Sequence, residues 1–236
     1  MKVWRGLCGV LLACGLLAVT FFGSFRVVIF NRNYMNRELT RLGIAEQVSM
    51  TQEDLMAVFD EILDYLAGKR ADLVIETTVA GEQREAFNER EKAHMEDVLG
   101  LFNQGFRIYY AGAGLTVLML VPALVWRRER RELLRVYGKC TVIVFAVFFI
   151  LGGLVGILLA TDFDFYFTLF HKIFFNNDLW LLDPRTDLMI NLVPEPFFMH
   201  TALTIGGIFL AAALLILIGA SLLWRRLSPS QKHEKG

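Results

Sequence analysis

Four long apolar stretches, separated by polar segments, dominate the pattern of this sequence. They cover residues 7–25, 108–126, 140–160 and 201–224. Each is close to the roughly 20 residues that an α-helix needs to cross the hydrocarbon core of a bilayer. The first stretch has no small-residue cleavage site and exceeds the apolar length of a signal peptide, so we expect it to remain as a membrane helix. The pattern therefore predicts a mainly α-helical membrane protein with four transmembrane helices.

The first long polar segment, residues 31–106, has the features of a small α(+β) domain. Thr51 is a typical N-cap, and an apolar helical spacing follows it until Gly68. Residues 72–80 are rich in β-branched side chains and predict a strand. From Phe87 onward the spacing becomes helical again, and we expect this helix to continue into the second membrane span.

The second long polar segment, residues 161–200, combines many aromatic rings with polar groups. Phe163, Phe167, His171 and Phe174 recur at helical spacing. Such a pattern is typical of a helix that lies in the interface between hydrocarbon and water. After it, the sequence predicts another short helix around residues 179–182.

These patterns divide the chain into eight segments. They are the first membrane helix (1–30), an extracytoplasmic domain (31–106), the second membrane helix (107–126), a basic cytoplasmic loop (127–139), the third membrane helix (140–160), an extracytoplasmic interfacial segment (161–200), the fourth membrane helix (201–224) and a cytoplasmic tail (225–236).

Composition agrees with a membrane location, and the charge distribution predicts the orientation. The 236 residues are 55% hydrophobic, and 24 basic side chains balance 24 acidic ones, so net charge indicates no nucleic-acid partner. The termini and the loop 127–139 together carry 12 basic and three acidic residues, whereas the two long connections carry 12 basic and 21 acidic ones. Because basic short loops stay in the cytoplasm, we expect both termini inside a bacterial plasma membrane.

Several classes of site lack support in the sequence. Cys8, Cys14 and Cys140 lie in or beside apolar runs without metal-binding spacing, and no phosphate-binding loop or serine-hydrolase elbow occurs. Glu91 and His94 form one Glu-x-x-His pair, which is half of a carboxylate-bridged metal motif. We therefore expect neither a metal nor a cofactor, although a metal-dependent membrane hydrolase remains an alternative.

Two histidines are the main candidates for chemistry. His94 and His171 each lie on the apolar face of a predicted helix among charged neighbours. They could be core histidines satisfied by acids such as Glu91 or Asp97, or they could converge. A pair of imidazoles can exchange protons near neutral pH, which suits general acid–base catalysis.

Other polar groups in the interfacial segment could assist such a pair. Arg185, Asn176 and Asn177 are candidates to stabilise a developing oxyanion. Asp178 and Asp183 could orient an imidazole or bind an ammonium group, although helix capping would explain them equally well. A non-enzymatic lipid-binding or regulatory membrane protein, in which both histidines are structural, is the other alternative.

Two strings resemble a known family: FNEREKAHMEDV at residues 87–98 and FTLFHKIFFNNDLWLLDPRTD at residues 167–187. They are similar to the four-span lipoprotein intramolecular transacylases of Gram-positive bacteria. The resemblance implies that the sn-2 acyl chain of a diacylglyceryl lipoprotein moves to the α-amine of its N-terminal cysteine, giving a lyso-form lipoprotein.

The resemblance also implies a site and its surroundings. His94 and His171 would form a catalytic pair at the extracytoplasmic face, with no cofactor and no acyl-enzyme. Diacylglyceryl lipoproteins and membrane phospholipid are the expected partners, and we expect the protein to be a monomer.

Overall fold

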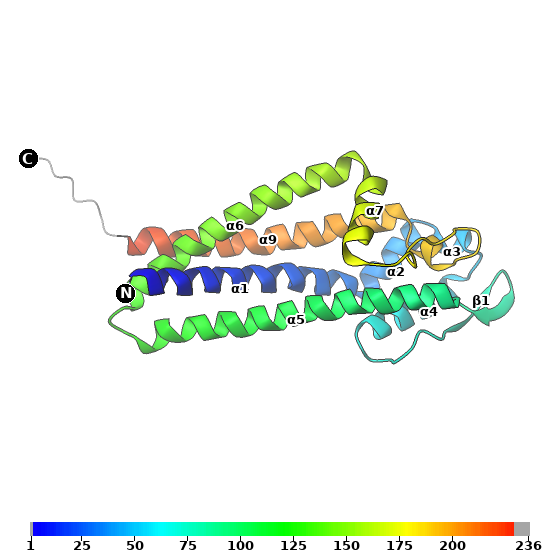
Figure 1. Cartoon of the computed structure of the whole chain (residues 1–236), viewed down its shortest axis with the longest axis horizontal. Coiled ribbons are helices and arrows are strands. Elements are labelled where there is room, and N and C mark those ends of the chain that lie inside the picture. The colour runs from blue at the N-terminus through cyan, green and yellow to red at the C-terminus, as the bar shows by residue number, and fades with distance from the viewer. Residues whose placement is uncertain (1, 229–236) are drawn as a thin grey trace, which may run out of the picture. The chain divides into compact units, whose positions relative to one another are not determined.

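The structure is a computed structural model, and it describes residues 2–228 (Figure 1). In chain order the elements are α1 (Lys2–Ile29), α2 (Arg32–Arg41), α3 (Ile44–Gln47), α4 (Gln52–Leu66), β1 (Glu76–Val79), β2 (Glu82–Glu85), α5 (Glu89–Val125), α6 (Arg130–Thr161), α7 (Phe163–Phe174), α8 (Met189–Leu192) and α9 (Glu195–Leu227).

Four helices within residues 2–228 are long and apolar enough to cross a membrane, as the hydrophobic pattern predicts. They are α1, α5, α6 and α9. Each extends beyond its apolar stretch, and α5 runs from Glu89 to Val125 without a break. The prediction that the helix after Phe87 continues into the second span is therefore confirmed. The chain is a mainly helical, multi-pass integral membrane protein.

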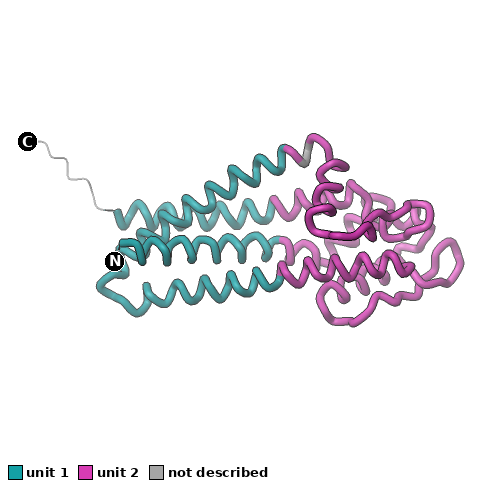
Figure 2. Tube along the Cα trace, in the orientation of Figure 1, with its two compact units in different colours: residues 1–24, 106–157, 207–236 teal, residues 25–105, 158–206 magenta. Residues whose placement is uncertain are grey.

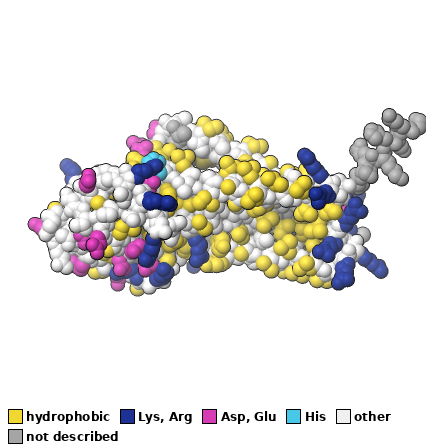
Figure 3. All heavy atoms as spheres, turned by 180° about the vertical axis from the view of Figure 1, so that it is seen from behind, with side chains coloured by type: hydrophobic (Ala, Val, Ile, Leu, Met, Phe, Trp, Pro, Cys, Tyr) yellow, Lys and Arg dark blue, Asp and Glu magenta, His cyan; other side chains and the backbone are white. Residues whose placement is uncertain are grey.

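The chain divides into two compact units, shown in Figure 2. Unit 1 comprises residues 1–24, 106–157 and 207–236, and unit 2 comprises residues 25–105 and 158–206. Unit 1 exposes many large hydrophobic side chains, such as Leu215 and Val117, as expected for helices in contact with lipid. Acidic side chains gather on unit 2 (Figure 3).

Small residues let α1 and α5 approach closely inside unit 1. A Cβ atom added at Gly15 would lie 2.6 Å from Thr116 Oγ1 and 2.9 Å from the carbonyl oxygen of Gly112. Helices in lipid gain most of their association from such close packing, because hydrocarbon offers no hydrophobic driving force between them. Contacts at this distance leave no room for even one methyl group.

Unit 2 contains a hydrophobic core built on α4. Its apolar stripe includes Leu55 and Phe59, which are buried. The predicted N-cap is confirmed, because the Thr51 side chain accepts a hydrogen bond from the Asp54 amide at 3.0 Å. The helix ends at Leu66, and Gly68 follows with a φ of 72°, a conformation that favours glycine.

The predicted strand is present but shorter than residues 72–80, and it belongs to a hairpin. β1 pairs with β2 in antiparallel register, with Val79 opposite Glu82. The two residues between the strands, Ala80 and Gly81, have φ values of 54° and 81°, which is typical of a tight hairpin turn. The sequence analysis missed β2 because its residues, EQRE, have little intrinsic strand preference.

The interfacial segment also departs from prediction at one point. α7 forms as predicted, but the prediction of a short helix around residues 179–182 is wrong. A turn stands there instead, in which the Leu181 amide donates to the Asp178 carbonyl at 3.0 Å. The Asn177 side chain accepts from the Leu179 amide, and the Trp180 indole donates to the Asn177 carbonyl, so local side-chain bonds replace helical ones.

We predict that Gly15→Ala lowers the melting temperature of the purified protein in detergent. The added methyl group forces α1 and α5 apart, with an expected cost of about 1–3 kcal/mol. Gly114→Ala on α5 is the matched control, because a Cβ there meets nothing within 4 Å. Equal melting temperatures for the two variants would show that this close approach does not stabilise the protein.

Candidate active site

His94 lies in the second turn of α5, whose start is held by reciprocal capping. The Asn88 side-chain oxygen accepts from the amides of Arg90 and Glu91 at 2.9 and 3.0 Å. In return, one Glu91 carboxylate oxygen accepts from the Asn88 amide at 2.8 Å. This arrangement is a capping box, and it satisfies amides that a helix start would otherwise leave unpaired.

The other oxygen of Glu91 reaches the chain that follows α7. It accepts from the Met189 amide at 2.7 Å, and the Glu91 side chain is only 1% exposed. Burial raises the pKa of this carboxyl group, while the backbone donors Met189 and Asn88 oppose the rise. Glu91 thus joins the start of α5 to α8.

A second buried carboxylate supports the same junction. Asp187 accepts from the Asn88 side-chain amide at 2.8 Å and from the Asp183 amide at 2.7 Å. Asn88 therefore caps α5 with one end of its side chain and holds the 183–187 turn with the other.

His171 is presented by α7, which begins after its N-cap residue Asp162. The imidazole is 7% exposed, and its Nδ1 lies 2.7 Å from the Phe167 carbonyl oxygen. Because a carbonyl can only accept, Nδ1 carries the hydrogen and Nε2 keeps its lone pair. Burial lowers the pKa of His171, and the bond to Phe167 partly opposes that shift.

The two imidazoles come together inside unit 2. Their ring centroids are 6.0 Å apart, so the two rings converge, which was one of the arrangements that the sequence left open. Phe175 contacts both rings, at centroid distances of 5.4 and 5.5 Å. Trp180 stacks on His171 at 4.8 Å, and Phe167 lies 4.2 Å from the same ring. The pair therefore lies in a largely aromatic environment.

This environment keeps His94 neutral. Burial, together with the nearby His171, lowers the pKa of His94 to about 4, although Asp97 acts in the opposite direction. Its buried Nδ1 has no hydrogen-bond partner among residues 2–228. This nitrogen is therefore a buried polar atom whose hydrogen bonding the described residues leave unsatisfied.

The acids that flank His94 in the sequence have other partners. Glu91 binds backbone amides, as described above, and Asp97 accepts from the Asn177 side chain at 2.8 Å. Both nevertheless hold the interfacial segment against α5, one turn on either side of His94. They position the surroundings of the pair.

The remaining predicted residues lie at the surface of the interfacial segment. Asp178 is 3.7 Å from Arg90, and Arg185 forms an ion pair with Asp183 at 2.6 Å. Asn176 is exposed. Sequence analysis did not single out Phe175 or Trp180, since its only signal for them was the general aromatic content of the segment.

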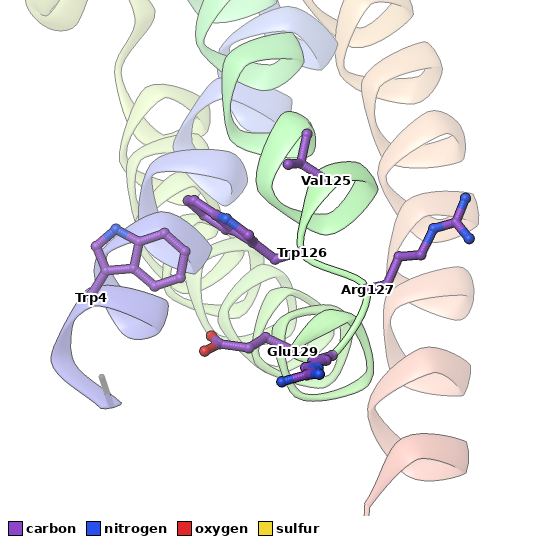
Figure 4. Close-up of a pocket in the computed structure, with 6 residues that line it drawn as sticks. Trp4, Val125, Trp126, Arg127 and Glu129 are labelled. Carbon is purple, nitrogen blue, oxygen red and sulfur yellow. The ribbon is translucent and has the colours of Figure 1, made fainter.

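No metal centre is evident in the described part of the chain, where no three His, Cys, Asp or Glu side chains gather as ligands. A cavity of about 660 Å³, drawn in Figure 4, lies in unit 1. Both histidines belong to unit 2. The walls of the cavity include Trp4 and Trp126, whose rings meet edge to face at 4.9 Å. This cavity contains neither of the candidate histidines.

Comparison with known proteins identifies the family. The model for "Lipoprotein intramolecular transacylase Lit" matches residues 10–198, which is most of the chain. The chain belongs to the Lit family. It is therefore an acyltransferase of the lipoprotein intramolecular transacylase type.

Solved structures of Lit from Bacillus cereus have the same fold. One matches with a TM-score of 0.75 at 22% identity, over 96% of this chain and 98% of that one. A second, with a histidine-to-arginine substitution, matches with a TM-score of 0.73 at 21% identity, over 95% of this chain and 94% of that one. A third carries a histidine-to-alanine substitution. No curated protein sequence matches the chain.

We predict that Glu91→Ala strongly destabilises this Lit-family chain. It leaves the buried Met189 amide and the Asn88 amide without their acceptor, at an expected cost of about 2–4 kcal/mol. Thermal unfolding in detergent measures the loss. The control is Glu89→Ala, two residues earlier, where the side chain is 93% exposed and pairs with Lys92. A fall in melting temperature that is equal in both variants would contradict the structural role of Glu91.

Proposed function

We propose that His94 and His171 catalyse transfer of the sn-2 acyl chain of a diacylglyceryl lipoprotein to the α-amine of its N-terminal cysteine. The observation that carries the proposal is the pair of buried imidazoles, 6.0 Å apart, in a chain of the Lit family. The product is a lyso-form lipoprotein with an N-acyl, S-monoacylglyceryl cysteine.

The pair suits the proton transfers that this reaction requires. The α-amine has a pKa near 7.7–8, so a large fraction is protonated at neutral pH and a base must remove one proton. A neutral imidazole is such a base. The amine nitrogen then attacks the ester carbonyl carbon, and the bond from that carbon to the glycerol oxygen breaks. The imidazole that took the ammonium proton gives it to the departing oxygen, and the other, neutral imidazole takes the second proton from the attacking nitrogen and releases it to water.

Both histidines begin in the form that proton transfer needs. The pKa of His94 is near 4 and that of His171 is below its usual value, so at pH 7 both rings are neutral. Two neutral rings offer lone pairs to the ammonium group, and the ring that accepts its proton becomes the acid. The nucleophile and the ester belong to one molecule, so holding them in contact supplies much of the rate.

The exposed face of α7 suits the acyl chains. Phe165, Leu169 and Ile173 are 40–66% exposed, although all three are apolar. We propose that this face lies against lipid and that membrane phospholipid surrounds the bound lipoprotein. His171, on the opposite side of the same helix, is then close to the depth of the ester groups.

The oxyanion that forms at the ester carbon needs donors, and the interfacial segment offers several. Asn177 and Arg185 already bind Asp97 and Asp183, so their participation requires an exchange of partners. Asn176 is exposed beside the end of α7. We retain Asn176 and Arg185 in this role, and we assign Asn177, Asp178 and Asp183 to local structure.

We expect His94→Ala and His171→Ala each to abolish lyso-lipoprotein formation while the protein still accumulates in the membrane. Each variant removes one of the two proton carriers. Mass spectrometry of the N-terminal peptide of a lipoprotein, from cells with and without the gene, measures the product. His200→Gln is the control, because His200 pairs with Glu38 and lies outside the proposed pair.

Two results would overturn this assignment. An unchanged acyl pattern in cells with and without the gene would show that the chain lacks the activity. Loss of activity after treatment with a chelator, restored by added metal, would favour a metal-dependent reaction over a two-histidine one.

We also propose that both termini are cytoplasmic and that the histidine pair faces outward. In a variant without native cysteines, Glu82→Cys in the hairpin should react with an impermeant maleimide on intact cells. Arg130→Cys should react only after permeabilisation, because the basic loop stays inside. The reverse pattern of labelling would contradict this orientation.

A further inference from the structure

We propose that Trp180 is a positioning residue for His171, and that Asp97 and Asn177 form a latch that keeps Trp180 in place. The inference rests on the proposed function, since it assumes that His171 carries a proton during acyl transfer. Four observations carry it, and all concern unit 2.

The indole of Trp180 is fixed on the face of the His171 ring. The two rings stack at a centroid distance of 4.8 Å and an interplanar angle of 29°. The indole Nε1–H donates to the Asn177 carbonyl oxygen at 3.0 Å. This bond holds the edge of the indole, so the ring cannot turn away from the imidazole without losing a hydrogen bond.

Asn177 is itself held on both ends of its side chain. Its Nδ2 donates to Asp97 Oδ2 at 2.8 Å, and its Oδ1 accepts from the Leu179 amide at 3.1 Å. The first bond ties the turn to α5, and the second shapes the turn that carries Trp180. We call the bond between Asp97 and Asn177 the latch.

Two side chains of α5, those of Arg90 and Asp97, bind this turn. Asp97 follows His94 by three residues, and Arg90 precedes it by four, so all three lie along one side of the helix. Arg90 donates to the Asp178 carbonyl oxygen and lies 3.7 Å from the Asp178 carboxylate. α5 carries His94. Through Arg90 and Asp97 it therefore also holds the turn in which Trp180 stacks on His171.

The stack has two consequences for proton transfer. The bond from Nδ1–H to the Phe167 carbonyl oxygen and the indole on one face together restrict rotation of the His171 ring. Nε2 therefore keeps one direction. When His171 accepts a proton, the face of the indole also attracts the cation, an effect worth roughly a 2- to 30-fold change in an equilibrium. Loss of the indole should thus slow the chemical step more than it weakens binding.

The test compares initial rates of lyso-lipoprotein formation in proteoliposomes. Trp180→Leu should lower kcat by about tenfold and change KM by less than about twofold, because the lost interaction acts on the reacting imidazole. Trp180→Phe, which keeps an aromatic face, should restore most of the rate. Trp126→Leu in unit 1 is the control and should leave kcat unchanged.

The latch has its own test. Asp97→Ala should lower kcat by about threefold and Asn177→Ala by at least as much, because Asn177→Ala also removes the acceptor of the Leu179 amide. The double variant should be no slower than Asn177→Ala alone, since all three variants remove one shared bond. Asn177 is exposed, Asp97 is half-buried, and neither belongs to the hydrophobic core, so these variants do not open the core and remain informative if Trp180→Leu fails to accumulate. Additive losses would show that the two residues act separately and would overturn the latch.

A spectroscopic measurement distinguishes a change in the position of the His171 ring from a general loss of protein stability. In protein labelled with ¹⁵N-histidine, His171 should give the signals of a single tautomer with hydrogen on Nδ1. Trp180→Leu and Asp97→Ala should shift these signals toward a mixture of tautomers, while Trp126→Leu should not. Unchanged signals in both variants would overturn the inference.

Two outcomes distinguish a wrong positioning role for Trp180 from a wrong function. If Trp180→Leu has the wild-type kcat while His171→Ala is inactive, the positioning role is wrong and the proposed function stands. If His171→Ala is active, the proposed function itself is wrong.

Discussion

The candidate site depends on the hydrogen bonds of one buried carboxylate, that of Glu91. Its two oxygens accept from the amides of Asn88 and Met189, residues about 100 positions apart in the chain. Burying a carboxylate is costly unless donors satisfy it, and here the donors come from two different segments. The start of α5 and the chain around α8 therefore keep one arrangement, which brings His94 within reach of α7.

The same burial that organises the site makes both histidines weak bases, and this bears on the proton transfers that we propose. An imidazole surrounded by Phe175 and other apolar groups resists becoming a cation, so both histidines lose basicity relative to free histidine. An acyl transfer between an amine and an ester needs carriers that accept and release a proton within one turnover. A pair of weak bases, each neutral at rest, is suited to a transient charge, because neither ring holds the proton tightly.

Much of this fold could be predicted from the sequence, because apolar length and helical spacing directly reflect the membrane and the core. The four spans, the N-cap at Thr51 and the helix α7 follow from such local rules. The second strand could not be predicted in the same way, since EQRE is strand only through its pairing with β1. The turn around Trp180 was likewise mistaken for a helix, because its side-chain bonds to Asn177 are specific to this arrangement.

In the site, as in the fold, the sequence predicts features that depend on neighbouring residues better than contacts between distant segments. Both histidines and the flanking acids can be recognised in the sequence, where Glu91 and Asp97 relate to His94 because all three share one helix. In the structure the acids bind Met189 and Asn177, residues on the segment that carries the other histidine. The order Glu91, His94, Asp97 along one side of α5 thus divides the roles among the three residues. The central residue does chemistry in our proposal, and the outer two fix the segment that must face it. The two acids lie beside one histidine in the sequence, but through their bonds to Met189 and Asn177 they act on the geometry of the pair.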